Sequence, residues 1–292
     1  MMGGPMGGPM GQPVMPPPPG YGMPAPPNPT LEGNMAGLDP ALMNLQSIMD
    51  VIRNGVYIKQ KMDLLEVVTG IDTANTYYVF ELSPSGEAFR RLIFECKETS
   101  DFMDRNCSPG QCRAIDLVLL KAGSGRDRQV VLHMTKPCQC TCCCASRPEL
   151  KIFLTEGGRD TYLGKVCEPW TCCHHSYEVF DATGSRRFTL TADCCQCGFF
   201  CKCPCEACET IRFDVTSGES RNPEPPIFKK GSGNCLKNSV SSVDYFSVPF
   251  PRNASWTDKA LLLAATLMID YMKFEEKPDR DNHNRNGITV TF

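Results

Sequence analysis

The stretch Ser255-Trp-Thr-Asp-Lys-Ala-Leu-Leu-Leu-Ala-Ala-Thr-Leu-Met-Ile-Asp-Tyr-Met-Lys-Phe274 is the one long helical signal in the folded part of this chain. Ser255 is followed three residues later by Asp258, the spacing of a capping box, which predicts a helix over residues 256–274. Its leucines, methionines and isoleucine fall on every face of that helix. A helix that is apolar all round lies inside protein or inside lipid.

The charges within this helix bear on that choice. At 1.5 Å per residue the helix would be about 28 Å long, nearly the thickness of a bilayer's hydrocarbon layer. However, Asp270 and Lys273 lie within it, and the uncharged run covers only residues 260–269. An aspartate near the bilayer centre costs about 2.5–3.5 kcal/mol. We therefore expect a core helix wrapped in protein, with a membrane span as the alternative.

Composition narrows the class of protein. The 292 residues allow one large or two small domains. A net charge of −3 and a pI of about 5.9 argue against nucleic-acid binding. Residues 1–29 have neither the basic start nor the apolar segment of a signal peptide, so we expect the chain to face the cytosol. In that compartment, nineteen cysteines indicate thiol, metal or lipid chemistry rather than disulfides.

The N-terminal segment, residues 1–38, is rich in proline, glycine and methionine and carries little charge. Such a segment cannot bury a core, so we expect a disordered tail. Within it, Pro18, Pro19 and Tyr21 fit the PPxY form that WW domains bind, which makes WW-domain proteins candidate partners. The alternative is a flexible tail in which such motifs arise by chance.

Most of the remaining chain has the period of two that indicates strands. A helix is expected first, over residues 39–52, capped by Asp39. About a dozen strand-like segments follow, and strands in that number pair as a sandwich or close into a barrel. An apolar helix would fill the interior of a barrel. The segments are 56–59, 64–68, 76–82, 88–95, 114–120, 129–134, 150–154, 161–166, 177–180, 187–191, 210–215 and 244–250.

An internal repeat favours one closed sheet over two unrelated domains. Each copy consists of a hairpin, a cysteine loop and a further strand. The loops contain Cys138-Gln-Cys140 in the first copy and Cys195-Gln-Cys197 in the second. The two cysteine clusters therefore occupy equivalent places in the predicted sheet.

The first cysteine cluster favours S-acylation over metal binding. Cysteines bunched on a loop beside a membrane are typical acylation targets, and two or more chains make anchoring stable. Consecutive cysteines are awkward ligands for a single tetrahedral ion. Thiols without a role are the third alternative. The candidate acylation sites are Cys138, Cys140, Cys142, Cys143 and Cys144.

For the second cluster, acylation and metal binding are equally favoured. It contains two CxxC pairs, and thiolates at this spacing can hold a zinc ion in a tetrahedral site. The candidate zinc ligands are Cys194, Cys197, Cys205 and Cys208.

The sequence contains no nucleophile–base signature and no phosphate loop. We therefore expect no enzyme activity.

Several motifs together resemble the phospholipid scramblase family, and the resemblance spans residues 42–276. It implies a tubby-like fold, in which a closed twelve-stranded antiparallel barrel surrounds a buried hydrophobic helix. It also implies calcium-triggered movement of phospholipids between leaflets, in both directions and without ATP. Family members are palmitoylated in the loop that matches residues 138–144. The motifs are Asp63-Leu-Leu-Glu-Val-Val-Thr-Gly70, Asp104-Arg-Asn-Cys107, Asp244-Tyr-Phe-Ser-Val-Pro-Phe-Pro251 and Ile269-Asp-Tyr-Met-Lys-Phe-Glu275.

The calcium segment departs from the family pattern. Ser242 and Asn253 stand where the family has aspartates, and only Asp244 supplies a carboxylate. Calcium takes six to eight oxygen ligands, so we expect a weak, degenerate calcium site at these residues.

The resemblance also sets the expected organisation and location of the chain. The domain would cover residues 39–276 and be followed by a tail over residues 277–292. The chain would act on phospholipid membranes at the cytosolic face of the plasma membrane, held by acyl chains, by the helix or by both. It would enter the nucleus when unacylated, and oligomer formation stays open. The alternative is a membrane-tethered, lipid-binding adaptor that recruits WW-domain partners through its N-terminal tail.

Overall fold

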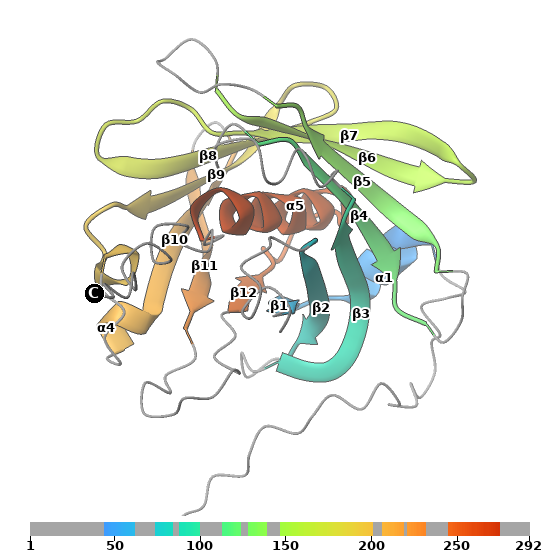
Figure 1. Cartoon of the computed structure of the whole chain (residues 1–292), viewed down its shortest axis with the longest axis horizontal. Helices are drawn as coiled ribbons and strands as arrows, with labels where there is room; N and C mark the ends of the chain where they lie inside the picture. Colours follow the sequence, from blue (N-terminus) through green and yellow to red (C-terminus); the bar gives the residue numbers. More distant parts are fainter. Residues whose placement is uncertain are drawn as a thin grey trace, which may run out of the picture. The chain divides into compact units, whose positions relative to one another are not determined.

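Twelve antiparallel strands close into a barrel around one helix in the computed structural model of this protein (Figure 1). Contacts divide the chain into two units, residues 1–32, which lie outside the described residues, and residues 33–292, which hold the barrel. The structure describes residues 44–61, 74–83, 88–99, 113–123, 128–138, 147–200, 206–218, 221–231 and 245–274.

The barrel is a simple meander, because each strand pairs with its neighbours in the sequence and β1 closes on β12. The predicted closed twelve-stranded barrel is therefore confirmed. Among the described residues, four helical segments accompany the strands: α1 (Leu45–Val51), the short 3-10 turn η3 (Cys197–Phe199), α4 (Glu206–Glu209) and α5 (Trp256–Lys273). The strands are β1 (Gly55–Lys61), β2 (Thr76–Leu82), β3 (Ala88–Glu98), β4 (Ile115–Lys121), β5 (Val130–Lys136), β6 (Glu149–Glu156), β7 (Arg159–Cys167), β8 (His174–Asp181), β9 (Arg186–Asp193), β10 (Thr210–Ser217), β11 (Asn222–Lys230) and β12 (Tyr245–Pro249).

Closure of the barrel depends on a close approach at Gly55, the first residue of β1. Gly55 faces Pro249 across the β1–β12 pair and has a φ of +134°, which side chains rarely allow. A Cβ atom built there would lie 2.2 Å from the backbone oxygen of Val248. Any other residue at position 55 would therefore push apart the two strands that close the sheet.

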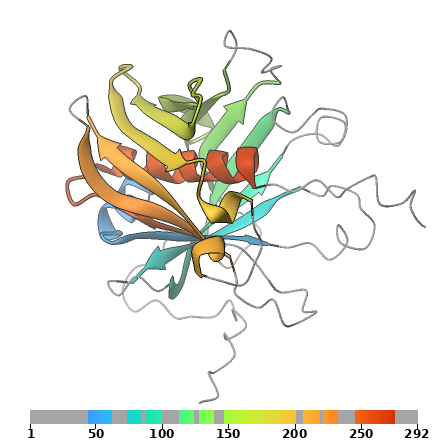
Figure 2. The same ribbon diagram turned by 90° about the vertical axis from the view of Figure 1, so that its left-hand side faces the viewer.

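Helix α5 fills the interior of the barrel, and Figures 1 and 2 show the strands around it. The expected capping box is present: the Oγ of Ser255 accepts a hydrogen bond from the backbone N of Asp258, whose carboxylate accepts one from the backbone N of Ser255. From Asp258 to Met272 every residue is buried. The helix is thus the core of the barrel, as its all-round apolar sequence predicted. Among the described residues, no helix combines the length and apolarity that crossing a bilayer requires.

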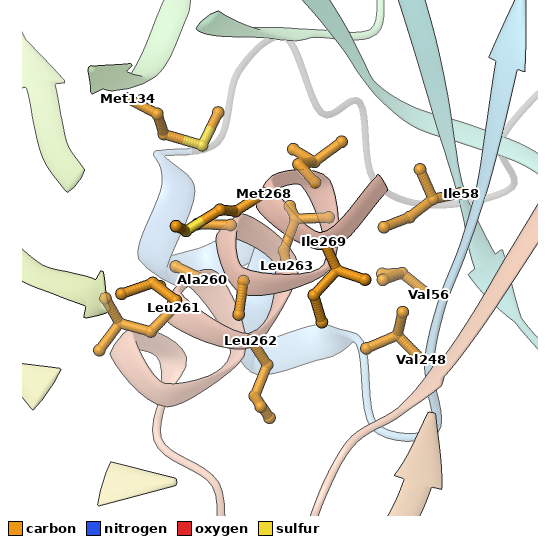
Figure 3. Packing of buried hydrophobic residues seen from close by; sticks show 14 of the residues in the cluster. Val56, Ile58, Met134, Val248, Ala260, Leu261, Leu262, Leu263, Met268 and Ile269 are labelled. Carbon is orange, nitrogen blue, oxygen red and sulfur yellow. The ribbon is translucent and has the colours of Figure 1, made fainter. Parts of the chain in front are cut away.

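Alternate side chains of each strand point inward and pack on the helix. Val56 and Ile58 of β1 and Val248 of β12 are almost fully buried, and Figure 3 shows them beside Ile269 of the helix. A buried aliphatic side chain contributes about 1.5–3 kcal/mol. The strands' inner faces and α5 therefore form one continuous core.

Three expectations about local structure need correction or fall outside the described residues. The first helix begins at Leu45 rather than near residue 39, because Asn44 is extended and its side chain accepts a hydrogen bond from Ser47 N.

Strand β11 was not predicted, since prolines at 223, 225 and 226 remove its backbone donors. The barrel tolerates them because β12 pairs only with the last part of β11, Phe228 to Lys230. The expected strand at 64–68 lies outside the described residues.

Candidate functional site at the cysteine-rich end of the barrel

One end of the barrel collects the cysteines. In an antiparallel meander, alternate connections lie at the same end, so those from β1 to β2, β3 to β4, β5 to β6, β7 to β8, β9 to β10 and β11 to β12 share one end. Every cysteine of the chain except Cys96 falls within or at the edge of these connections in the sequence. We call this the cysteine-rich end. It is also where α5 ends, since Lys273 reaches Glu168, the residue after β7.

A buried polar network underlies this end and is centred on Glu98, the last residue of β3. Its carboxylate accepts hydrogen bonds from Arg113 Nη2 at 2.6 Å and from the hydroxyl of Tyr271 at 2.9 Å. The backbone N and the Nδ2 of Asn75 donate to it at 3.0 Å. All four residues are buried. The network therefore ties the ends of β2, β3 and β4 to the last turn of α5.

A second buried carboxylate, that of Glu168, holds the same helix end from the opposite wall. Lys273 Nζ lies 2.7 Å from Glu168 Oε1, and Arg147 Nε donates to the backbone oxygen of Glu168 at 2.9 Å. His175 lies nearby, and burial, aided by the charge of Lys273, lowers its pKa below the ordinary value. Burial therefore favours the neutral form of His175.

Two large aromatic side chains are exposed at the cysteine-rich end. Trp170, between β7 and β8, is 59% exposed, and Phe200, between β9 and β10, is 78% exposed. The two connections are adjacent, because His175 at the start of β8 packs its ring 4.8 Å from that of Phe199 in η3. Exposed aromatic side chains on adjacent connections make this end a candidate surface for contact with a membrane or another protein.

The described thiols of this end are accessible. Cys138, Cys172, Cys173, Cys195 and Cys197 are exposed, and Cys167, Cys194 and Cys208 are partly exposed. The thiols of Cys194 and Cys195 lie near the carboxylate of Asp193, all within 4.8 Å of one another. This is a ligand set that thiophilic cations accept.

The predicted acylation and partner residues fall mainly outside the described part of the chain. Cys138 is exposed just after β5. The other residues with these predicted roles lie outside the described residues: Cys140, Cys142, Cys143, Cys144, Pro18, Pro19 and Tyr21.

The predicted zinc ligands are only partly gathered. Within the described part, the grouped ligand atoms belong to Asp193, Cys194 and Cys195, and neither Cys197 nor Cys208 joins that group. Cys205 lies outside the described residues. The predicted four-cysteine set therefore stays a prediction.

Only one of the three predicted calcium residues, Asn253, lies within the described part of the chain. Ser242 and Asp244 lie outside the described residues, but Tyr245, which follows Asp244, begins β12. Asn253 lies exposed beyond the other end of that strand. Because Ser242 and Asp244 lie outside the described residues, the predicted calcium site stays a prediction.

Reasoning from sequence missed several residues of this end. Trp170 and Phe200 each lie close to cysteines, which was a usable signal, but their exposure is a tertiary property. Glu98 and Arg113 could not be paired from the sequence, since a connection of fourteen residues, 99–112, separates them.

Comparison with known proteins decides the family. The Scramblase family profile matches residues 35–276, which include α1, every strand of the barrel and α5. This chain belongs to the scramblase family. The match covers the whole fold, and the sequence resemblance is confirmed.

Scramblases of several vertebrates are similar to this chain. It is 27% identical to phospholipid scramblase 2 of Homo sapiens over 255 residues, which are 87% of this chain and 74% of that protein. It is 27% identical to phospholipid scramblase 1 of Mus musculus over 264 residues, 90% of this chain and 70% of that protein. Phospholipid scramblase family member 5 of Homo sapiens is 25% identical over 222 residues, 75% of this chain and 73% of that protein. No solved structure gave a significant match.

Proposed function

We propose that this chain moves phospholipids between the leaflets of a membrane, in both directions and without ATP. The family match over residues 35–276 carries the proposal, because it includes the complete barrel and its central helix. The relatives described above are named phospholipid scramblases. No covalent bond is made or broken in such a process, so the expected activity is transport rather than enzymatic catalysis.

The filled interior indicates where lipid would be handled. Leu263, Leu267 and Ile269 of α5 have no exposed surface, and inward-pointing strand residues pack against the helix. A lipid passing through the barrel would have to displace its hydrophobic core. We therefore place lipid contact on the outside of the barrel, at the cysteine-rich end.

Membrane attachment would use acyl chains and aromatic side chains together. One acyl chain binds a membrane only marginally, so several cysteines are expected to act together, and Trp side chains favour the membrane–water interface. In this proposal the chain lies on the cytosolic face of the plasma membrane, with the nucleus as its destination when unacylated. The acylated residues would be Cys138, Cys140, Cys142, Cys143 and Cys144.

Acylation is tested by changing Cys142, Cys143 and Cys144 to Ala together. We expect the variant to move from the membrane fraction to the cytosol or nucleus. Hydroxylamine, which cleaves thioesters, should release the unchanged protein in the same way. Unchanged membrane partition after hydroxylamine would show that thioester-linked chains do not hold the protein there.

Calcium is proposed as a weak trigger. Of the three predicted ligands, Ser242, Asp244 and Asn253, only Asp244 carries a carboxylate. Sites with few charged ligands bind calcium with dissociation constants of about 10⁻⁴–10⁻³ M. We expect any calcium response in this range, and Asp244→Asn should abolish it.

A second candidate function, that of a membrane-docked adaptor, is favoured by the filled interior of the barrel. A barrel with no open interior and an aromatic, cysteine-rich end is suited to docking on a membrane as an adaptor. Its N-terminal tail would then recruit WW-domain proteins through Pro18, Pro19 and Tyr21.

Reconstitution separates the two candidates. The purified full chain is inserted into vesicles that carry a fluorescent phospholipid in both leaflets, and a membrane-impermeant reductant bleaches the outer leaflet. The scramblase proposal expects bleaching to continue beyond the outer half, faster with millimolar calcium. If no more than half of the fluorescence is bleached at any calcium concentration while the protein stays bound to the vesicles, the scramblase proposal fails and the adaptor function is favoured.

The membrane-contacting end is tested with Trp170→Ser/Phe200→Ser. Each aromatic side chain that leaves the interface should cost on the order of 1.5 kcal/mol or more, so the double variant should bind acidic vesicles at least about tenfold more weakly. The control is Val51→Ser, which removes an exposed apolar side chain from α1. Equal binding by the double variant and the control would exclude this end as the contact surface.

A further inference from the structure

Two pairs of adjacent cysteines meet at the open end of the β8–β9 hairpin. The register of the two strands ends there with Asp193 on β9. β9 is followed by Cys194 and Cys195, and β8 is preceded by Cys172 and Cys173. The Sγ of Cys194 lies 2.8 Å from the backbone oxygen of Cys173, so the two pairs are in direct contact.

The spacing of the ligand atoms fits one metal ion. The carboxylate of Asp193 and the thiols of Cys194 and Cys195 all lie within 4.8 Å of one another, and the two sulfur atoms are 3.9 Å apart. In a tetrahedral site with Zn–S bonds of about 2.3 Å, two sulfur ligands are roughly 3.8 Å apart. The observed separation therefore matches one edge of a zinc-centred tetrahedron.

Cys173 is the candidate fourth ligand. Its thiol is exposed and lies outside the group of three, but its backbone oxygen contacts the Sγ of Cys194. The exposed side chain would therefore have to turn toward the ion to complete the site. Thiols are deprotonated when they bind a metal, so the affinity of the site should rise with pH.

The ligands are held on rigid structure. Asp193 Oδ1 accepts a hydrogen bond from the backbone N of Cys195 at 2.9 Å. The side-chain amide of Gln196 donates to the backbone oxygen of Arg212 and accepts from its backbone N, both at 2.8 Å. The turn that carries Cys195 is therefore fixed to β10. Ligands supported in this way need little reorganisation to bind an ion.

We propose that Asp193, Cys194, Cys195 and Cys173 bind one zinc ion. The set differs from the CxxC pairs that the sequence suggested. Adjacent cysteines are awkward ligands for one tetrahedral ion in general, but the turn after β9 holds the Sγ atoms of Cys194 and Cys195 3.9 Å apart, a separation that such an ion accepts. The ion would join the β7–β8 connection to the β9–β10 connection, which carry Trp170 and Phe200. The site is independent of the proposed lipid movement, because its ligands can bind zinc whether or not the chain transports lipid.

Metal content tests the site. The full chain is produced in bacteria, which avoids S-acylation by the native host, and is reduced, supplied with zinc and dialysed against a weak chelator. We expect the double variant Cys194→Ser/Cys195→Ser to bind one zinc ion per chain fewer than the unchanged protein after dialysis. Cys173→Ser should lower the affinity for the same ion at least about tenfold, measured by competition with a chelator. Circular dichroism checks that each variant is folded.

Two controls distinguish this site from the other thiols. Cys197→Ser and Cys138→Ser change exposed cysteines outside the ligand set and should retain the ion. Cobalt in place of zinc should give the visible absorption of a tetrahedral thiolate site, which should be lost in the Cys194/Cys195 variant and retained in Cys197→Ser and Cys138→Ser. The proposal is overturned if that variant binds as much zinc as the unchanged protein. It is also overturned if Cys197→Ser loses the same ion, which would point to the CxxC set.

Discussion

Glu98 is the residue on which the buried polar contacts of the cysteine-rich end converge. It joins Arg113, Asn75 and Tyr271 in a place where the side chains of Glu98 and Arg113 are at most 1% exposed. Removing one partner of a buried ion pair leaves the other charge without compensation. The network thus fixes the ends of three strands against α5.

The first prediction concerns this ion pair. Glu98→Ala should lower the free energy of unfolding by about 3–5 kcal/mol, since Arg113 would keep its charge and lose this carboxylate. The control is Asp214→Ala, which breaks the exposed Arg212–Asp214 pair and should cost under about 1 kcal/mol. Urea unfolding measures both. Similar losses in the two variants would contradict the assigned role of Glu98.

The second prediction concerns pH and Asp258. Burial alone would raise the pKa of Asp258, but hydrogen bonds from Arg187 and Ser255 outweigh it, and the pKa lies below its ordinary value. The stabilisation is therefore present above the unfolded pKa of about 3.9 and is lost as pH falls through the lower folded value.

Thermal unfolding at pH 7 and pH 3 tests this assignment. Asp258→Asn should be clearly less stable than the unchanged protein at pH 7, and the difference should shrink at pH 3. A difference that stays constant with pH would mean that the carboxylate charge does not contribute.

Individual residues also show the limit of sequence reasoning about the site. The spacing of Cys194 and Cys197 pointed to a CxxC zinc site. The described ligand group contains Cys194 with Asp193 and Cys195, and the four-cysteine set stays a prediction because Cys205 lies outside the described residues. The contact of Cys194 with Cys173 depends on the register between β8 and β9, which no spacing within one segment contains.

Helix α5 is the element that the sequence predicted best. Its start is encoded locally, by Ser255 and Asp258, and its burial follows from apolar residues on every face. Strand β11 shows the opposite case. Its prolines argue against a strand. They are acceptable because the part of β11 that contains them pairs with β10 alone, while β12 pairs only with Phe228 to Lys230.

The third prediction concerns the buried face of α5. Leu263→Asp or Leu267→Asp would place a charge where no exposed surface exists, so each should destabilise the barrel by more than about 4 kcal/mol. The control is Thr257→Asp in the first turn, where an acidic residue is favourable. Thermal unfolding compares the three. A folded Leu267→Asp variant as stable as the control would show that α5 is not the core.

The whole molecule depends on closure around that helix. The number of strands was close to the prediction, because period-two segments and turns are local signals. The internal repeat predicted equivalent places for the two cysteine clusters, and the strand order extends this to one end that carries every connection containing cysteines. The buried network and the exposed aromatic side chains require the three-dimensional structure, since their members come from distant connections.

The central claim is that α5 is the folding core of the barrel rather than a detachable anchor, and a truncated chain tests it most directly. A chain that ends at Ser255 lacks the helix, so the inner faces of the strands lose their packing partner. A control chain that ends at Phe274 keeps the helix. We predict that the control unfolds cooperatively at the melting temperature of the full chain, whereas the shorter chain precipitates or shows no cooperative transition. A soluble, cooperatively unfolding chain ending at Ser255 would contradict the account.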